Sequence, residues 1–403
     1  MPVRDPPEHI GRRRVYATVA RDGASPPVSG SVPRVMTPVD VAFDVGPLSG
    51  RRTGIGVAVA ELRQNLEARS DVTLTPYLTS FRAARSPGQV RVPMPAMVAQ
   101  RCWERAEHPR IDRRVRPARV IHGTNYVVPP SRLPRLVSVY DCWFLRHPES
   151  ALPDVVRAGR ILMRSLARGA TAHASSHATA DALRDIAPYA EVSVVHLGAI
   201  ALPAATAECP IPELGSRPFV LATGTIERRK NLPRLVDAFG RASSDVDGLS
   251  LVIAGGDGDD RHRVDQAIDR LPRRLADRVL LTGYVPDDAR SWLLRNAAVL
   301  AYPSLDEGFG FPLLDAMQAQ VPIVASRAGS IPEVAGEAAE LCDASDTDEL
   351  AACLVRAVVD DERRTRMLHA GKRQLEIFTW ARTTEGIVDL YRRLADRSPS
   401  RAR

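Results

Sequence analysis

The chain has 403 residues, enough for two or three domains, and with 44% hydrophobic and 26% charged residues its composition is that of a globular protein. The net charge is +7, but the arginines are spread along the chain, aromatic residues are only 5%, and no nucleic-acid-binding motif occurs, which disfavours nucleic acid as a partner. Five scattered cysteines without a C-x-x-C pair indicate neither a disulfide framework nor a zinc site, and they fit a cytoplasmic protein.

Residues 1–35 are rich in proline, arginine, glycine and serine and lack the apolar segment of a signal peptide. We therefore expect a disordered extension over 1–35. Met36 is an alternative start of the chain, since the folded pattern begins directly after it.

Residues 36–198 alternate apolar strands with helical stretches, a pattern typical of a parallel α/β domain. The strands that we expect are 39–45, 120–122, 136–140, 172–175 and 192–196. A glycine-rich stretch, Gly50–Gly56, separates the first strand from a helix. Its spacing does not match a dinucleotide fingerprint, which disfavours a dinucleotide-dependent oxidoreductase.

Four arginines of this first half, Arg157, Arg160, Arg164 and Arg168, recur at spacings of three and four residues. They therefore share one face of a helix. Such a face is most often simply solvated. The functional alternative is peripheral contact with an anionic membrane, which would place the protein at the inner face of that membrane.

The second half follows a proline-rich linker over 199–216 and repeats the alternation of strands and helices over 217–379. The strands that we expect here are 219–222, 249–254, 279–281, 298–302 and 322–325. An acidic loop, 255–260, contains Asp-x-Asp, and we interpret it as solvated rather than as a metal site. A last helix is expected over about residues 380–396.

A first motif occupies Phe219–Leu232, where a buried strand leads into a basic loop containing Arg229 and Lys230. Of the 55 lysines and arginines in the chain, only Lys230 and Lys372 are lysines. An ammonium group acts as a point charge on phosphate, and ligands of parallel sheets gather at the carboxyl ends of strands. We predict that this loop binds phosphate, with a solvated basic loop as the alternative.

A second motif occupies Asp306–Met317. Gly308 and Gly310 let the backbone approach a ligand closely, and the free amides at the start of the following helix can bind phosphate. Glu307 and Asp315 bracket the loop with carboxylates, which suit hydroxyl groups. The layout predicts a ligand with phosphate in the middle and hydroxyls at both ends, as in a nucleotide diphosphate sugar. The alternative is a strand, turn and helix that bind nothing.

The two motifs resemble the "GT-x-E-x-RKN" and E-x7-E signatures of retaining glycosyltransferases of family 4, with Asp315 in place of the second Glu. The resemblance implies an α/β structure of the GT-B type. In that fold two Rossmann-like domains face each other across a cleft, and a C-terminal helix crosses back to the first domain. It also implies transfer of a hexose from a nucleotide diphosphate sugar to a glycan or lipid-linked acceptor, without metal or cofactor. The donor that the resemblance favours is GDP-mannose.

By this resemblance Arg229 and Lys230 stabilise the departing diphosphate, Glu307 holds the sugar hydroxyls, and Asp315 holds the ribose. Further donor-binding positions that it implies are Gly54, Val285, Phe309, Gly310, Phe311 and Leu313.

In the first domain, the resemblance suggests that His122 orients an acceptor hydroxyl, although a lone histidine at a strand end is as often structural. Tyr140-Asp141 stands where the family commonly has His-Asp. A tyrosine cannot share a proton near neutral pH. This departure therefore predicts either reduced activity or a different sugar pocket.

Two other functions fit the same architecture. A nucleotide-sugar epimerase would need no acceptor, and a non-catalytic nucleotide-sugar-binding protein would turn over no donor. Dependence on an acceptor separates the transferase from the epimerase, and donor turnover separates it from the binding protein.

Overall fold

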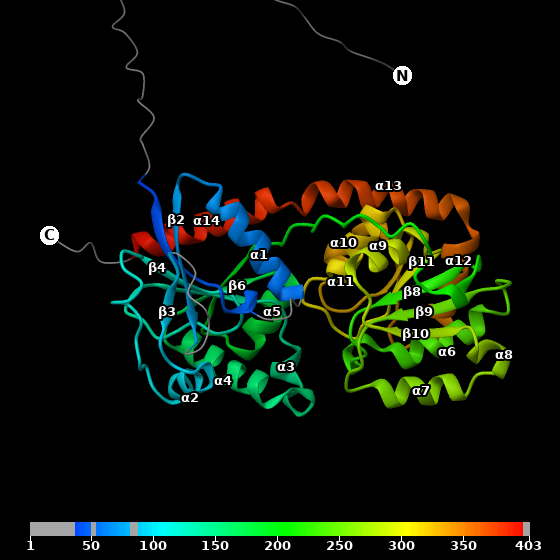
Figure 1. Ribbon diagram of the computed structural model, residues 1–403, viewed down its shortest axis with the longest axis horizontal. Coiled ribbons are helices and arrows are strands. Elements are labelled where there is room, and N and C mark those ends of the chain that lie inside the picture. Colours follow the sequence, from blue (N-terminus) through cyan, green and yellow to red (C-terminus); the bar gives the residue numbers. More distant parts are fainter. Residues whose placement is uncertain (1–36, 50–53, 81–87, 398–403) are drawn as a thin grey trace, which may run out of the picture. The chain divides into compact units, whose positions relative to one another are not determined.

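The computed structural model describes residues 37–49, 54–80 and 88–397. The extension expected over 1–35 lies outside these residues, as do Gly50–Thr53 of the glycine-rich stretch. From Pro38 onward the chain forms one compact unit, which contains two parallel β-sheets (Figure 1). No helix among the described residues is both long enough and apolar enough to cross a lipid bilayer.

In the described part of the chain, the first sheet has seven parallel strands in the order β3-β2-β1-β4-β5-β6-β7. Its order reverses between β1 and β4, which is therefore the topological switch point, where parallel sheets bind ligands. The strands are β1 (Val39–Asp44), β2 (Val72–Thr79), β3 (Val90–Val92), β4 (Val120–Gly123), β5 (Arg135–Val139), β6 (Thr171–Ala174) and β7 (Glu191–Val194). The helices are η1 (Gly46–Leu48), α1 (Gly54–Glu67), α2 (Ala96–Arg105), α3 (Trp143–Arg146), η2 (Pro148–Ser150), α4 (Pro153–Ala167) and α5 (His177–Ile186).

The second sheet has six parallel strands among the described residues, in the order β10-β9-β8-β11-β12-β13, with its switch point between β8 and β11. The strands are β8 (Phe219–Thr223), β9 (Ser250–Ala254), β10 (Val279–Gly283), β11 (Val299–Tyr302), β12 (Ile323–Ser326) and β13 (Glu340–Cys342). The helices from η3 to α9 are η3 (Pro212–Leu214), η4 (Arg228–Lys230), α6 (Leu232–Ala242), α7 (Arg261–Asp269), α8 (Arg273–Ala276) and α9 (Asp287–Asn296). Those from α10 onward are α10 (Phe311–Ala319), α11 (Ile331–Ala335), η5 (Gly336–Ala338), α12 (Thr347–Val359), α13 (Asp361–Ile377) and α14 (Trp380–Asp396).

All of the strands predicted from sequence are present to within two residues at each end, including the edge strands β7 and β10. Strands such as β4, β9 and β12 are buried along their whole length, so they appear in the sequence as continuous apolar runs. Strands β2, β3 and β13 were not predicted from the sequence. These strands lie at or next to sheet edges, and their partly exposed positions interrupt the apolar run.

The last helix, α14, returns to the first domain, as predicted. It packs against α1, β1 and β4 (Figure 1). The hydroxyl of Tyr391 on α14 lies 2.7 Å from Nδ1 of His122, and Arg119 donates a hydrogen bond to the carbonyl of Ala395. The α/β fold with two Rossmann-like domains and a returning helix is thereby confirmed.

Candidate functional site

The two motifs meet at the switch point of the second sheet. Arg229 and Lys230 lie in η4, beyond β8, and Glu307 follows β11, the strand beside β8. The Nζ of Lys230 lies 2.7 Å from Oε1 of Glu307, and the guanidinium of Arg229 pairs with Oε2. Residues 77 positions apart in sequence thus form one ionic cluster at the carboxyl ends of adjacent strands.

This cluster is buried. Its side chains are only 7% exposed for Glu307, 11% for Lys230 and 18% for Arg229. Burial alone would raise the pKa of Glu307, but the positive charges of Lys230 and Arg229 outweigh it and hold that pKa at about 2. Ser304 also donates to Oε1 of Glu307, at 2.7 Å. The carboxylate is therefore ionised and fully engaged at neutral pH.

The loop of the first motif is held by its neighbours. Asn231 adopts a left-handed conformation, with φ of 55°, and its side chain donates to the carbonyls of Pro303 and Ala344 at 3.2 and 2.8 Å. The backbone N–H of Arg228 donates to Asp259 at 3.0 Å. Residues 257–259 of the acidic loop are exposed, in agreement with its interpretation as solvated, and Asp259 in addition supports the basic loop.

Gly308 and Gly310 are required for two different reasons. Gly310 precedes α10 with φ of 102°, a conformation that favours glycine. A Cβ on Gly308 would lie 1.6 Å from the carbonyl oxygen of Tyr140. The close backbone approach at Gly308 is thus to the protein's own first domain, whereas the sequence analysis assigned it to a ligand.

Three hydroxyl groups of the first domain hold this loop, and the sequence analysis missed all of them. Ser175, Ser176 and Thr179 each donate to the carbonyl oxygen of Gly308, at 3.0, 2.8 and 3.0 Å. A serine–threonine cluster at the start of a helix usually indicates only a cap, so no sequence signal pointed to this contact.

The side chains of Phe309 and Leu313, two further residues of the second motif, are packed inside the protein and are less accessible to a donor than predicted. Phe309 packs against the rings of Phe311 and Phe378, and Leu313 is fully buried with its N–H bonded to the carbonyl of Gly310. Donor binding by Phe309 or Leu313 would therefore have to use backbone atoms rather than side chains. Pro312 lies in the first turn of α10.

Asp315 lies on α10 and is ion-paired with Arg290, with 2.6 Å between Nη1 and Oδ2. Burial raises the pKa of Asp315 more than Arg290 lowers it. Arg290 was not predicted, because an arginine in a charged surface helix gives no distinct signal.

Of the other predicted donor positions, Val285 follows the carboxyl end of β10 and is partly buried, whereas Gly54 begins α1 and is exposed.

A cleft of about 1230 Å³ runs between the two sheets. Arg229 and Thr225 line it from the second domain, and Asp44, Asn125 and Asp141 line it from the first. The structure therefore brings the basic loop and polar residues of the first domain to one cavity.

His122 does not reach this cleft. It is fully buried, with Nδ1 at 2.7 Å from the hydroxyl of Tyr391 and Nε2 at 2.8 Å from Oγ of Ser138. Burial lowers the pKa of His122 well below its usual range. The suggested contact with an acceptor hydroxyl is wrong for this structure, because His122 fastens α14 to the first sheet instead.

Tyr140 and Asp141 lie at the end of β5, beside the loop of the second motif. The hydroxyl of Tyr140 donates to the carbonyl of Thr124 at 2.9 Å, and burial raises the pKa of Tyr140, so it stays protonated. Oδ2 of Asp141 accepts from the hydroxyl of Tyr126 at 3.1 Å. Burial raises the pKa of Asp141 more than the nearby Arg229 lowers it.

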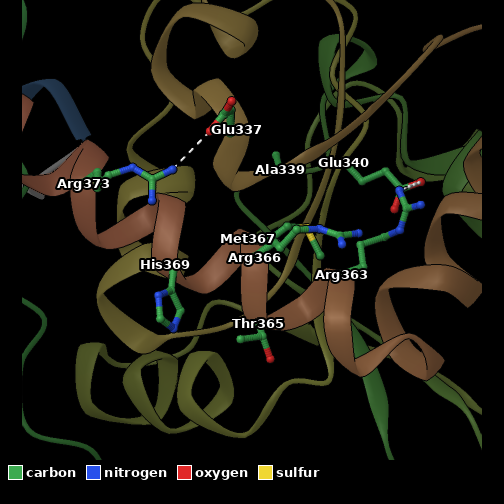
Figure 2. Close-up of a pocket in the computed structure, with 9 residues that line it drawn as sticks. All are labelled: Glu337, Ala339, Glu340, Arg363, Thr365, Arg366, Met367, His369 and Arg373. Carbon is green, nitrogen blue, oxygen red and sulfur yellow. Dashed lines mark hydrogen bonds and ion pairs between the residues drawn. The ribbon is translucent and has the colours of Figure 1, made fainter.

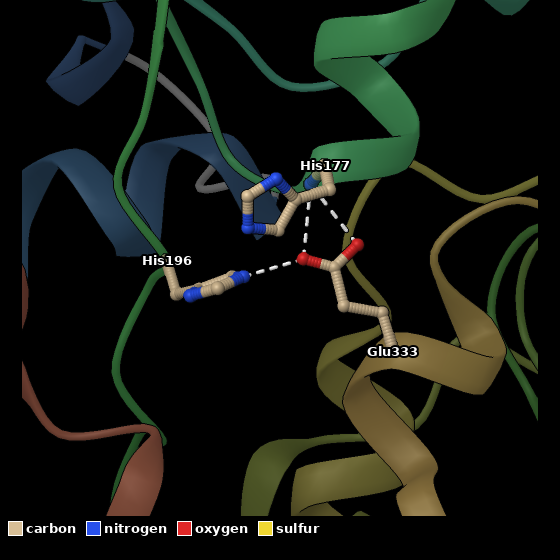
Figure 3. Close-up of side chains that lie close together, drawn as sticks. All are labelled: His177, His196 and Glu333. Atoms are coloured by element: carbon tan, nitrogen blue, oxygen red, sulfur yellow. Dashed lines mark hydrogen bonds and ion pairs between the residues drawn. The ribbon is translucent and has the colours of Figure 1, made fainter.

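A second connection between the domains is made by Glu333, on α11. Its carboxylate accepts hydrogen bonds from the backbone N–H of His177, at 2.9 and 3.0 Å, and lies 2.5 Å from Nε2 of His196 (Figure 3). The possible ligand atoms of these three residues lie within 4.8 Å of one another, close enough to hold a metal ion. Both carboxylate oxygens already accept hydrogen bonds from the backbone at the start of α5. The cluster is therefore better described as a hydrogen-bonded contact between the two domains.

The arginine face of α4 is largely neutralised. Arg157 and Arg160 pair with Glu104 on α2, and Arg164 pairs with Glu107 just beyond it. Their charges thus stabilise the packing of α2 against α4, which weakens the expectation of a free basic face.

A further hollow of about 550 Å³ lies along α13, away from the cleft (Figure 2). Arg373 pairs there with Glu337 at 3.1 Å, and Arg363 with Glu340 at 3.3 Å. Since these charges satisfy one another, we assign no ligand to this hollow.

Comparison with known proteins agrees with this geometry. Residues 210–374, which contain both motifs, match the family described as glycosyl transferases group 1. The O-antigen chain mannosyltransferase B of Escherichia coli is 33% identical over 198 residues. That alignment covers 48% of this chain and 51% of the relative, so the two proteins match over about half of their lengths.

Solved structures match over much more of the chain. Sucrose-phosphate synthase from Thermosynechococcus elongatus has a TM-score of 0.69 at 17% identity, covering 88% of this chain and 99% of that one. Anabaena HepE, solved with UDP and glucose, has a TM-score of 0.64 at 16% identity and covers 88% and 100%. At such low identity these matches establish the fold alone. The comparisons therefore show a match to glycosyl transferases group 1 over residues 210–374, in a chain with the two-domain fold of the GT-B type.

Proposed function

We propose that the protein transfers a hexose from a nucleotide diphosphate sugar to a hydroxyl group of a glycan or lipid-linked acceptor. The observation that carries this proposal is the buried cluster of Arg229, Lys230 and Glu307 at the switch point of the second sheet, of which Arg229 lines the cleft. Two adjacent cations in a water-poor site can stabilise the charge that develops on a departing diphosphate.

The proposed reaction needs no other cation for the leaving group, because Arg229 and Lys230 supply positive charge. The bond between the anomeric carbon and the diphosphate oxygen breaks, and the acceptor oxygen bonds to the same carbon. The acceptor proton passes to the departing diphosphate. Attack from the face that the diphosphate leaves would retain the anomeric configuration.

We favour mannose as the sugar and GDP-mannose as the donor. The mannosyltransferase relative from Escherichia coli supports the choice of sugar. The Anabaena structure, which was solved with UDP and glucose, supports a nucleotide and a sugar as ligands of this fold, and it makes UDP the first competitor of GDP in a binding test.

Peripheral contact with an anionic membrane at its cytoplasmic face remains a prediction. The paired arginines of α4 support it less than the apolar side chains at the cleft do. Met97 and Leu152 line the cleft and are 50% and 73% exposed. Such residues suit an acceptor with an apolar carrier.

Titration calorimetry with GDP, UDP and dTDP, with and without Mg²⁺, tests the donor site. We expect one nucleotide to bind without Mg²⁺, and Lys230→Ala to weaken that binding by about 10- to 100-fold, as for the loss of a charged hydrogen bond. Lys372→Ala is the matched control, since it removes the other lysine, which is exposed on α13. Binding of no nucleotide, or equal binding by both variants, would contradict the assignment.

A further inference from the structure

The switch point of the first sheet presents two polar residues to the cleft. Asp44 is the last residue of β1, and Asn125 lies two residues beyond β4, the adjacent strand. Both line the same cavity as Arg229. A site at this edge would thus face the donor site, as expected for ligands bound outside the carboxyl ends of parallel strands.

Both side chains have hydrogen-bonding capacity left over. Oδ1 of Asp44 accepts from the backbone N–H of Gly46 at 2.9 Å, which shapes the turn after β1. The described residues give this carboxylate no other hydrogen bond. Oδ1 of Asn125 is buried and has no partner among them. A buried acceptor without a donor is costly, which points to a ligand that supplies the donor.

The electrostatic setting favours a neutral hydroxyl as that ligand. Burial raises the pKa of Asp44 to about 7, against the smaller effect of the Gly46 hydrogen bond. Near neutral pH the carboxyl group is therefore divided between its protonated and ionised forms. A hydroxyl can donate to one form and accept from the other.

We propose that Asp44 and Asn125 bind the hydroxyl groups of a sugar acceptor and hold the attacking oxygen toward the donor. This inference rests on the proposed function, because the hydroxyl must face a donor diphosphate held by Arg229. It assigns the acceptor to the switch point of the first sheet, where the buried His122 cannot act.

The test separates transfer to a sugar from the hydrolysis of the donor by water. Wild type, Asp44→Asn and Asn125→Ala are supplied with GDP-mannose, or with the hexose donor of whichever nucleotide binds. Methyl α-D-mannopyranoside serves as the acceptor. We expect kcat/KM for this acceptor to fall by about 10- to 100-fold in Asp44→Asn, the size of a lost charged hydrogen bond, and by about 3- to 10-fold in Asn125→Ala, the size of a lost neutral one. Nucleotide affinity and donor hydrolysis should change less than about 2-fold.

Asp40→Asn is the matched control, because Asp40 lies at the other end of the same strand. It should leave transfer unchanged. A normal nucleotide titration with unaltered acceptor kinetics in both variants would overturn the acceptor role alone. A parallel loss of hydrolysis and transfer would also overturn it, because the two residues would then act on the donor or on folding. Absence of nucleotide binding by the wild type would overturn the proposed function and the acceptor role together.

Discussion

The two switch points carry carboxylates with opposite properties. Glu307, beyond β11, is surrounded by Arg229, Lys230 and Ser304, and its pKa is held at about 2. Asp44, at the end of β1, has a single hydrogen bond from Gly46 among the described residues, and its pKa is raised to about 7. The same place in the same kind of sheet can therefore produce either a permanent anion or a titrating group. The partners of the carboxylate decide which one is formed.

This difference suggests that the two sheets bind chemically different ligands on the two sides of the cleft. At the second sheet, Glu307 offsets one of the two positive charges that a diphosphate would contact, so donor binding must rearrange or share these ion pairs. At the first sheet, Asp44 and Asn125 keep hydrogen-bonding capacity in reserve. A charged ligand suits the first arrangement and a neutral hydroxyl suits the second.

The largest effect is expected from Glu307→Gln, which leaves two buried cations without their anion. We expect a loss of about 3–5 kcal/mol in the free energy of unfolding at pH 7, measured by urea denaturation. Because the pKa of Glu307 in the folded protein is about 2, below its ordinary value of 4.5, its stabilising contribution is present above pH 4.5. It is lost as the pH falls toward 2. The deficit of the variant should therefore shrink over that range.

A matched control for this experiment is Glu340→Gln. Glu340 is another poorly exposed carboxylate, with an 8% exposed side chain paired with Arg363, but it lines the hollow along α13 and has no contact with Arg229 or Lys230. This variant should also be destabilised while its nucleotide affinity stays unchanged. A deficit of Glu307→Gln that did not vary between pH 5 and pH 2 would argue against the ionic cluster.

A smaller change in the free energy of unfolding is expected from Asp44→Asn. It has the opposite sign, because this variant should be stabilised relative to the wild type as the pH rises. The folded protein keeps the Asp44 proton up to about pH 7, whereas the unfolded chain releases it near 3.8. The wild type therefore loses stability as the pH rises from about 4 to 7, and the asparagine variant does not. We expect the variant to gain about 2–3 kcal/mol relative to wild type between pH 4 and pH 8, with allowance for partial exposure. Parallel stability curves of the wild type and the variant would contradict the raised pKa of Asp44.

Much of the second domain could be predicted from the sequence, because its site residues lie directly after the strands that position them. Strand, loop and helix follow one another, so Arg229, Lys230 and Glu307 could each be placed at the carboxyl end of a buried strand before their contact was known. The partners of these residues were harder to predict. Arg290 and Ser175 bond to residues 25 and 133 positions away, and nothing in their immediate neighbourhood marks them.

The first domain was less predictable, for a related reason. His122 stands at a strand end and was assigned to the acceptor, but the side chain lies under α14, which begins more than 250 residues later. Asp44 ends an apolar strand in the same manner and does line the cleft. The sequence shows that both are polar residues at strand ends, whereas only the packing of α14 decides which one a ligand can reach.

The smallest effect concerns Tyr140, which holds the loop after β4 through its hydrogen bond to the carbonyl of Thr124. Tyr140→Phe should cost about 1 kcal/mol in the free energy of unfolding, because the buried carbonyl loses its donor. It should also lower transfer to the acceptor by a few-fold, since Asn125 is the next residue of that loop. Tyr77→Phe is the comparison, because the hydroxyl of Tyr77 lies farther from its acceptor, at 3.4 Å from the carbonyl of His122, and its loss should cost less. If Tyr140→Phe changed neither stability nor transfer, the loop would be held by other contacts, and the position of Asn125 would not depend on Tyr140.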